Sequence, residues 1–133
     1  MLLGSELGRV VFLSATYEGS VHDKAIADEQ GLQLPSGITL HQDLGFQGYA
    51  PEGVIVQMPH KKPRTRELTE EQKQENKQKA AVRVKVEHII GRVKIYRIVK
   101  DRIRMYKQGI KDLVMEIACA LNNFKLDYKN QLI

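Results

Sequence analysis

The sequence predicts an α/β or α+β fold, because strand-like apolar segments come early in the chain and long helical patterns come late. The early segments are residues 9–16, 38–42 and 54–58, each rich in apolar or β-branched residues and bounded by turn residues. The late segments are residues 69–98 and 110–124, where apolar residues recur at helical spacing. With 133 residues, 42% of them hydrophobic, the chain can bury the core of one modest domain.

Capping residues mark where the expected helices begin. Ser20 and Asp23 have the spacing of a capping box and predict a short helix that Gly31 ends. Thr69 and Gln72 have the same spacing and predict the start of the long helix.

The other helix boundaries are less sharply marked. The periodicity of the long helix reaches Val93 and extends toward Ile98, with a break expected near residues 99–101. The last helix is expected to carry its apolar residues on one face: Ile110, Leu113, Val114, Ile117, Leu121 and Phe124.

The expected strands make only a small mixed sheet. Three strands leave an exposed edge, which is a liability for an isolated domain. We expect one domain over residues 1–133, with the sheet in about 1–59 and a basic helical part in about 60–133.

Charge is distributed unevenly along the chain. The overall net charge is +5, but residues 1–59 carry −5, residues 60–107 carry +10 and the remainder is neutral. A basic segment beside an acidic one indicates a polyanion partner near a site that needs carboxylates. An exposed, solvated helix face is the alternative explanation.

Several classes of protein are excluded. The single cysteine, Cys119, rules out an intramolecular disulfide framework and a multi-cysteine zinc site, and it fits a reducing compartment. We expect it to be a buried apolar residue, not a catalytic thiol. No run of 18 apolar residues predicts a transmembrane helix, and residues 1–6 lack the features of a signal peptide.

The usual catalytic motifs are also missing. Phosphate-binding loops, dinucleotide fingerprints and hydrolase elbows do not occur. The four histidines have no paired spacing, which argues against a histidine zinc site: His22, His41, His60 and His88.

Asp43 is the first candidate for a functional residue. It stands where a strand ends and the glycine-punctuated loop 45–49 begins, a common place for a functional carboxylate in α/β sheets. Ordinary turn chemistry is the alternative. For Asp23, which competes with it, helix capping is the better interpretation.

Glu87 is the second candidate. At about 100° per residue on a helix, Arg83 lies roughly 40° and Lys94 roughly 20° from Glu87, so the three form one polar stripe. A carboxylate flanked by cations can hold a divalent metal while its neighbours bind phosphate. A simple Arg83–Glu87 surface pair is the alternative.

Five motifs, in this order along the chain, resemble those of the DDE transposases of bacterial insertion sequences related to Harbinger elements. In particular, Arg83, Glu87 and Lys94 match the arginine, glutamate and lysine of a family signature at every spacing. The motifs are Gly19-Ser-Val-His-Asp-Lys24, Asp43-Leu-Gly-Phe-Gln-Gly-Tyr49, Leu68-Thr69, the segment from Arg83 to Lys94, and Leu121-Asn-Asn-Phe124.

The resemblance implies a ribonuclease H-like fold in which three acidic residues hold two Mg²⁺ or Mn²⁺ ions for phosphoryl transfer on DNA. Asp43 corresponds to the second acid and Glu87 to the third, so both are expected to be catalytic metal ligands. The residues expected to contact double-stranded DNA are Arg83, Lys94, Lys61, Lys62 and Arg92. The resemblance also implies a cytoplasmic, nucleoid-associated bacterial protein that has no membrane partner.

The chain departs from the family pattern in three places. The first aspartate of the family lies on a strand upstream of residue 9 and has no counterpart here, so we expect a C-terminal part of the catalytic domain that is inactive alone. Ala80 occupies the position of the signature tyrosine, and Phe46 stands where tyrosine is more usual. Expected partners include the missing N-terminal part or a full-length transposase. The alternatives are a truncated DNA-binding or transposase-interacting regulator and a nonfunctional remnant.

Overall fold

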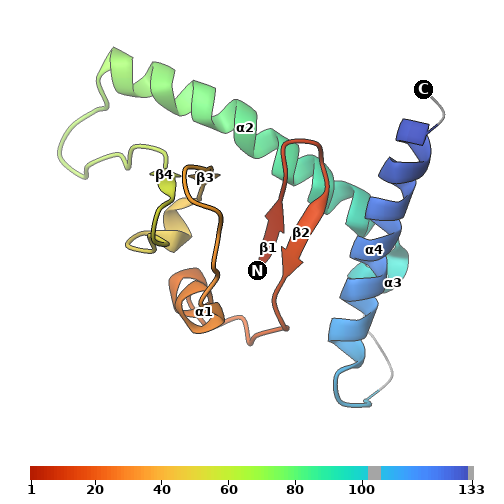
Figure 1. Ribbon diagram of the computed structural model, residues 1–133. Coiled ribbons are helices and arrows are strands. Elements are labelled where there is room, and N and C mark those ends of the chain that lie inside the picture. The colour runs from red at the N-terminus through yellow and green to blue at the C-terminus, as the bar shows by residue number, and fades with distance from the viewer. Residues whose placement is uncertain (102–105, 132–133) are drawn as a thin grey trace. The chain divides into compact units, whose positions relative to one another are not determined.

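The computed structural model describes residues 1–101 and 106–131 (Figure 1). Within these ranges the chain forms small sheets and long C-terminal helices, which confirms the mixed α/β class. The elements are β1 (Leu2–Gly4), β2 (Val10–Leu13), α1 (Asp23–Gln30), β3 (Thr39–His41), a 3₁₀ turn η1 (Leu44–Phe46), β4 (Ile55–Gln57), α2 (Glu70–Lys94), α3 (Arg97–Lys100) and α4 (Ile110–Gln131).

These elements belong to two compact units. Met1–Thr16 and Lys85–Ile133 form one unit, and Tyr17–Val84 forms the other. Helix α2 runs through both. The basic segment predicted over residues 60–107 includes residues 102–105, which lie outside the described residues. None of the described helices is long and apolar enough to cross a membrane.

The first unit is built on the hairpin of β1 and β2. The two strands are antiparallel, with Leu3 opposite Phe12. The strand expected over residues 9–16 is confirmed in its centre, whereas β1 was not predicted because three residues are too few to show a strand period. Gly4 allows the hairpin to approach α2 closely, since a Cβ there would collide with the side chain of Ile89.

The core of this unit joins the hairpin to two helices. Ile89 and Val93 of α2 are almost completely buried, together with Val10 of β2 and Ala118 and Cys119 of α4. The expectation that Cys119 is a core residue is therefore confirmed. Burial raises the pKa of its thiol, which keeps the sulfur protonated and unreactive.

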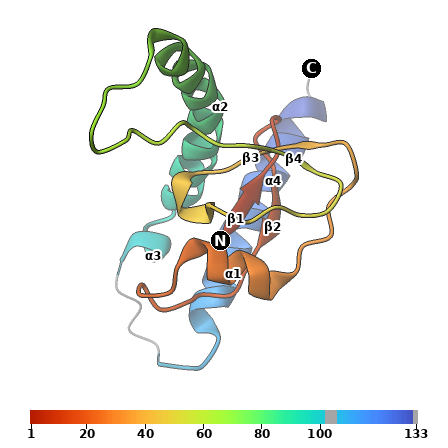
Figure 2. The ribbon, with the colours of Figure 1, turned by 90° about the vertical axis from the view of Figure 1, so that its left-hand side faces the viewer.

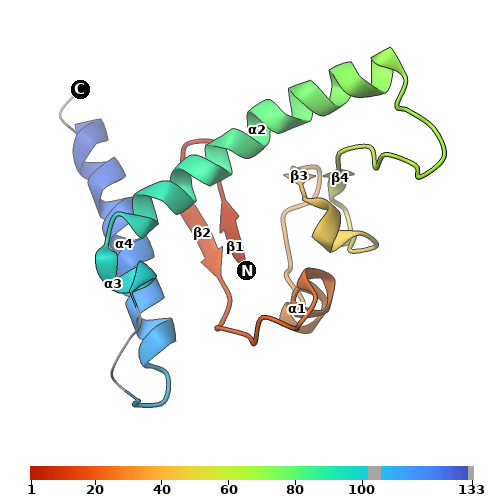
Figure 3. The same ribbon diagram turned by 180° about the vertical axis from the view of Figure 1, so that it is seen from behind.

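The buried face of α4 coincides only in part with the predicted apolar stripe. The stripe exists on the helix, but Ile117 is 51% and Phe124 66% exposed. The buried residues of α4 are Val114, which belongs to the stripe, and Ala118, Cys119 and Asn122, which do not. Helix α4 packs beside β2, as Figure 3 shows from behind. The helix also continues to Gln131, past the end expected at Phe124.

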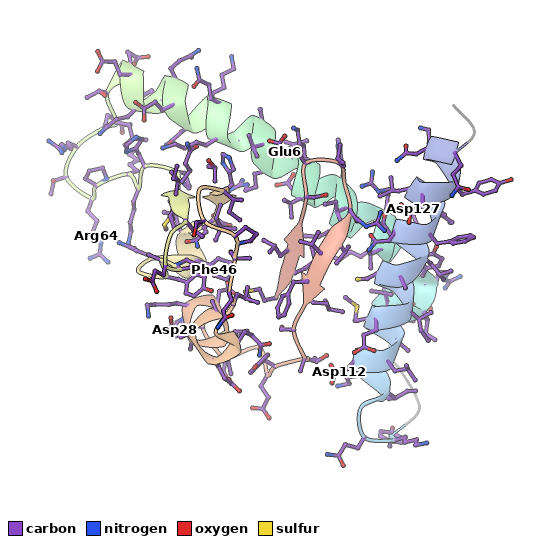
Figure 4. The ribbon with its side chains drawn as sticks, in the orientation of Figure 1. Glu6, Asp28, Phe46, Arg64, Asp112 and Asp127 are labelled. Atoms are coloured by element: carbon purple, nitrogen blue, oxygen red, sulfur yellow. The ribbon has the colours of Figure 1, made fainter. Side chains whose placement is uncertain are left out.

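Polar side chains of α4 cover the outer edge of β2. The Asn123 carboxamide accepts from the Val10 N–H (2.9 Å) and donates to the Val10 carbonyl (2.8 Å). Asp127 receives a two-pronged hydrogen bond from Arg9 just before the strand. Thr16 donates its N–H to Asp112 (2.7 Å) beyond the other end of the strand. Figure 4 labels both aspartates on α4.

The second unit contains a parallel pair, β3 and β4, with His41 opposite Gln57. Helix α1 packs near the turn η1, as Figure 2 shows. The predicted stop at Gly31 is confirmed by its left-handed backbone (φ 54°). The Ser20–Asp23 capping box is wrong, because α1 begins at Asp23 and its N-cap, His22, makes no side-chain cap. The Asp23 carboxylate instead lies so close to Gly45 that a Cβ there would collide with it.

Two further predictions concern the sheet and α2. The described strands form two separate two-stranded sheets, so the single small mixed sheet is a wrong expectation for these residues.

The capping box at α2 is confirmed, since Gln72 N–H donates to the Thr69 hydroxyl (3.2 Å) and Thr69 N–H to the Gln72 side chain (3.1 Å). The break after α2 comes at residues 95–96, earlier than expected, because Tyr96 takes an extended backbone before α3.

The contacts between α4 and β2 predict an acid-sensitive first unit. The Thr16 hydroxyl lowers the pKa of Asp112, and Arg9 lowers the pKa of Asp127. Since unfolded aspartate titrates at about pH 3.9, both carboxylates stabilise the fold above that pH and lose their effect as the pH falls through the lower folded values. We expect the urea concentration at the midpoint of unfolding to fall steeply below about pH 4. Circular dichroism measures this unfolding.

The variant that tests this prediction combines Asp112→Asn with Asp127→Asn. It should be less stable than the wild type at pH 7 and less sensitive to acid. Glu52→Gln, at an exposed position, should leave the profile unchanged. Equal acid sensitivity of wild type and double variant would contradict this assignment.

Candidate functional site

Asp43 stands directly after the parallel pair of the second unit. Its carboxylate accepts a hydrogen bond from the Leu44 N–H (2.8 Å) and so caps the turn η1. Phe46, labelled in Figure 4, closes the turn by donating its N–H to the Asp43 carbonyl (3.0 Å). The side chain of Asp43 is 59% exposed. The strand end and the turn thus hold this carboxylate in place at the surface, and turn chemistry is part of its role.

The structure brings Arg83 to this carboxylate. Arg83 Nη1 lies 3.4 Å from Asp43 Oδ1, although the two residues are 40 positions apart. Both side chains are more than half exposed, so the pair is solvated and contributes little stability. It does place a phosphate-binding type of cation next to the candidate acid.

Glu87 lies on α2 four residues after Arg83, but it belongs to the other compact unit. In the described part of the chain, no three His, Cys, Asp or Glu residues come together as a group that could hold a metal ion. Carboxylate oxygens are the right chemistry for Mg²⁺ or Mn²⁺. These residues alone therefore do not fit a complete divalent metal centre, because too few carboxylates are assembled.

A basic loop joins β4 to α2 in the second unit. Its cationic residues are all exposed: Lys61, Lys62, Arg64 and Arg66. Lys62 pairs with Glu67 across the loop (2.5 Å). Arg64 is labelled in Figure 4, where its side chain extends away from the loop. The loop therefore presents several cations to solvent at once.

Arg92 and Lys94, near the end of α2, differ in their surroundings. Arg92 donates to the Gly8 carbonyl (3.0 Å) and to the Asn122 side chain (3.0 Å), so it links the hairpin turn to α2 and α4. These bonds use two of the five N–H donors of a guanidinium. Lys94 is exposed beside a cavity of about 230 Å³ lined by apolar residues of β1, β2, α2 and α4.

Three asparagines with structural roles were missed by the motif search. Asn122 and Asn123 bind the hairpin, and Asn76 binds the backbone of His60. Asparagine is a poor residue for the interior of a helix, because its side chain competes with the backbone for hydrogen bonds. Its presence inside α2 and α4 was the signal that could have pointed to these contacts.

Comparison with known proteins gives a consistent result. The family model described as DDE superfamily endonuclease matches residues 2–123. The probable transposase for insertion sequence element IS702 of Microchaete diplosiphon is 30% identical over 87 residues, covering 65% of this chain and 32% of that protein. The putative transposase for insertion sequence element IS112 of Streptomyces albus G is 27% identical over 119 residues, covering 89% and 44%. The chain thus spans less than half the length of either relative, and no solved structure matches it.

The contacts of Arg92 predict that it stabilises the first unit while Lys94 does not. Arg92→Lys keeps the charge but loses the fork of N–H donors, which should lower the free energy of unfolding by about 1 kcal/mol. Lys94→Ala should leave the free energy unchanged within about 0.5 kcal/mol. Urea titration of both variants measures the difference. If Arg92→Lys were as stable as the wild type, the hydrogen bonds of Arg92 would not support the fold.

Proposed function

Because the chain belongs to the DDE superfamily endonuclease family, we propose that it is the C-terminal part of a transposase catalytic core. Its function would be metal-dependent cleavage and transfer of DNA strands in transposition. Two named transposases of insertion sequences support this proposal. The observation that carries it is the position of Asp43, a surface carboxylate at the carboxyl end of a parallel strand pair, beside Arg83. Ligand and substrate sites of open α/β sheets commonly lie at such strand ends.

In this proposal Asp43 and Glu87 are two of the acids of the centre. Both would be ligands of Mg²⁺ or Mn²⁺, and a further carboxylate from outside this chain would complete the set. The described residues support this requirement, since they do not assemble a metal site by themselves. In this proposal the chain alone does not cleave DNA.

Two-stranded sheets support a fold that needs a further strand. Each described sheet has only two strands, and β1 pairs with β2 alone. The apolar cavity of about 230 Å³ that Met1 and Leu2 help to line is surface that an added segment can cover. A ribonuclease H-like core with its first strand supplied by a preceding segment accounts for both observations.

DNA is the proposed substrate, held by phosphate contacts. The cations assigned to it are Lys61, Lys62, Arg83, Arg92 and Lys94. Exposed lysines and arginines neutralise phosphates without reading the bases. Arg92 would bind phosphate through the guanidinium N–H groups that its two structural hydrogen bonds do not use.

The catalytic proposal predicts a difference between the chain alone and a longer protein. The chain alone should not nick supercoiled DNA with Mg²⁺ or Mn²⁺, whereas a protein that adds an upstream strand with an aspartate should. In that longer protein, Asp43→Asn and Glu87→Gln should each lower nicking by several orders of magnitude. Agarose gels of plasmid topology measure the rate.

Glu71→Gln is the control, because Glu71 is also an exposed acid of α2 but has no part in the proposed site. It should leave nicking nearly unchanged. Nicking by the chain alone, or nicking that survives Glu87→Gln in the longer protein, would contradict the assignment.

A DNA-binding or transposase-interacting regulator without catalysis is the second candidate. The exposed basic loop and the lack of a metal group among the described residues favour it. Both candidates predict that the chain binds duplex DNA at low salt, with log Kd rising by roughly 0.9 per log unit of salt for each phosphate contacted.

Fluorescence anisotropy with a labelled duplex measures this binding. Lys61→Ala combined with Lys62→Ala should weaken binding and lower the salt slope by about two. Lys129→Ala, an exposed change near the end of α4, should have little effect. No binding at low salt would contradict both candidates, whereas binding without any nicking by the longer protein would favour the regulator.

A further inference from the structure

The basic loop is anchored to α2 at both ends. At its far end the Thr69–Gln72 capping box starts the helix. At its near end His60, three residues after β4, is bound to the second turn of α2. Figures 1 and 2 show the loop bowing outward between β4 and the start of α2. The four cations of the loop all lie between these two anchors.

The near anchor is a set of three hydrogen bonds. The His60 N–H donates to Asn76 Oδ1 (2.7 Å), and Asn76 Nδ2 donates to the His60 carbonyl (3.1 Å). The His60 ring contacts Glu75 Oε2 through Nε2 (2.6 Å). One carboxamide thus satisfies both backbone groups of His60, as a neighbouring strand would.

A cavity of the second unit adjoins the near anchor. A cavity of about 530 Å³ is lined by residues of β3, β4 and α2, among them Val56, Glu75 and Val82. Glu75 lines this cavity and also contacts His60, so polar contacts hold the start of the loop at its edge. His60 and Asn76 are half-buried, which protects their hydrogen bonds from full competition by water.

We propose that Asn76 is a positioning residue that holds the basic loop in a shape ready to bind a DNA phosphate backbone. This role rests on the proposed DNA-binding function. Lys61, Arg64 and Arg66 make no ion pair among the described residues, so they are available to phosphate once the loop is held. A prearranged loop loses less conformational entropy on binding than a free one, and several cations then engage together.

Asn76→Ala is the direct test, and Gln74→Ala is its matched control. Both replace a polar residue of α2 by the best helix former, so the helix itself is preserved. Gln74 is exposed and makes no hydrogen bond among the described residues. Circular dichroism should show the same helix content in both variants.

The first measurement is limited trypsin digestion with mass spectrometry. Asn76→Ala should increase initial cleavage after Lys61, Arg64 and Arg66 about tenfold, while Gln74→Ala leaves the rate unchanged. Asn76→Asp keeps the acceptor but loses the donor, so its rate should lie between those of the wild type and Asn76→Ala. An unchanged cleavage rate in Asn76→Ala would overturn the anchor.

The second measurement is duplex binding by anisotropy across a salt titration. Asn76→Ala should weaken Kd about three- to tenfold and lower the salt slope by about one, as expected for the loss of one phosphate contact. A role in stability alone would leave the slope unchanged and would overturn the proposal. If the wild type itself does not bind at low salt, the DNA-binding function fails, and the digestion result still decides whether the anchor exists.

Discussion

The hydrogen bonds of Asn123 with Val10 are the contact on which the first unit depends. A strand edge exposes N–H and C=O groups that must find partners or water, and the outer edge of β2 finds a side chain of α4. This contact requires α4 to lie along the strand, where Asp112 and Asp127 also reach the chain around β2. In this arrangement Ala118, Cys119 and Asn122 are buried, whereas most of the apolar stripe of α4 is exposed.

The second unit uses the same chemistry at Asn76. A carboxamide carries a donor and an acceptor at about the spacing of a peptide group, so it can satisfy one residue of backbone on both sides. Asn123 does this for Val10 and Asn76 does it for His60. In one case the result is a covered strand edge, and in the other it is a loop of cations held at a defined place. Two helices thereby supply what a longer sheet would otherwise provide.

The two candidate acids are held by different local structures. Asp43 is held by a strand end and a turn in one unit, whereas Glu87 stands on the part of α2 that belongs to the other. Two carboxylates provide fewer oxygen ligands than a two-metal centre requires. The described strands form two sheets of two strands each. The chain spans less than half of each related transposase.

The sequence by itself determined the features that are local or periodic. The capping box at Thr69, the stop at Gly31 and the long period of α2 depend on residues within a few turns of each other, so they could be predicted. The order and spacing of the motifs likewise indicated the family, which the family model confirms. The tertiary structure alone decided the pairing of β1, the buried face of α4, the Asp43–Arg83 contact and the structural bonds of Arg92. Apart from the β1–β2 hairpin, each of these joins residues far apart in the chain. Which partner a polar group finds depends on packing that no local pattern records.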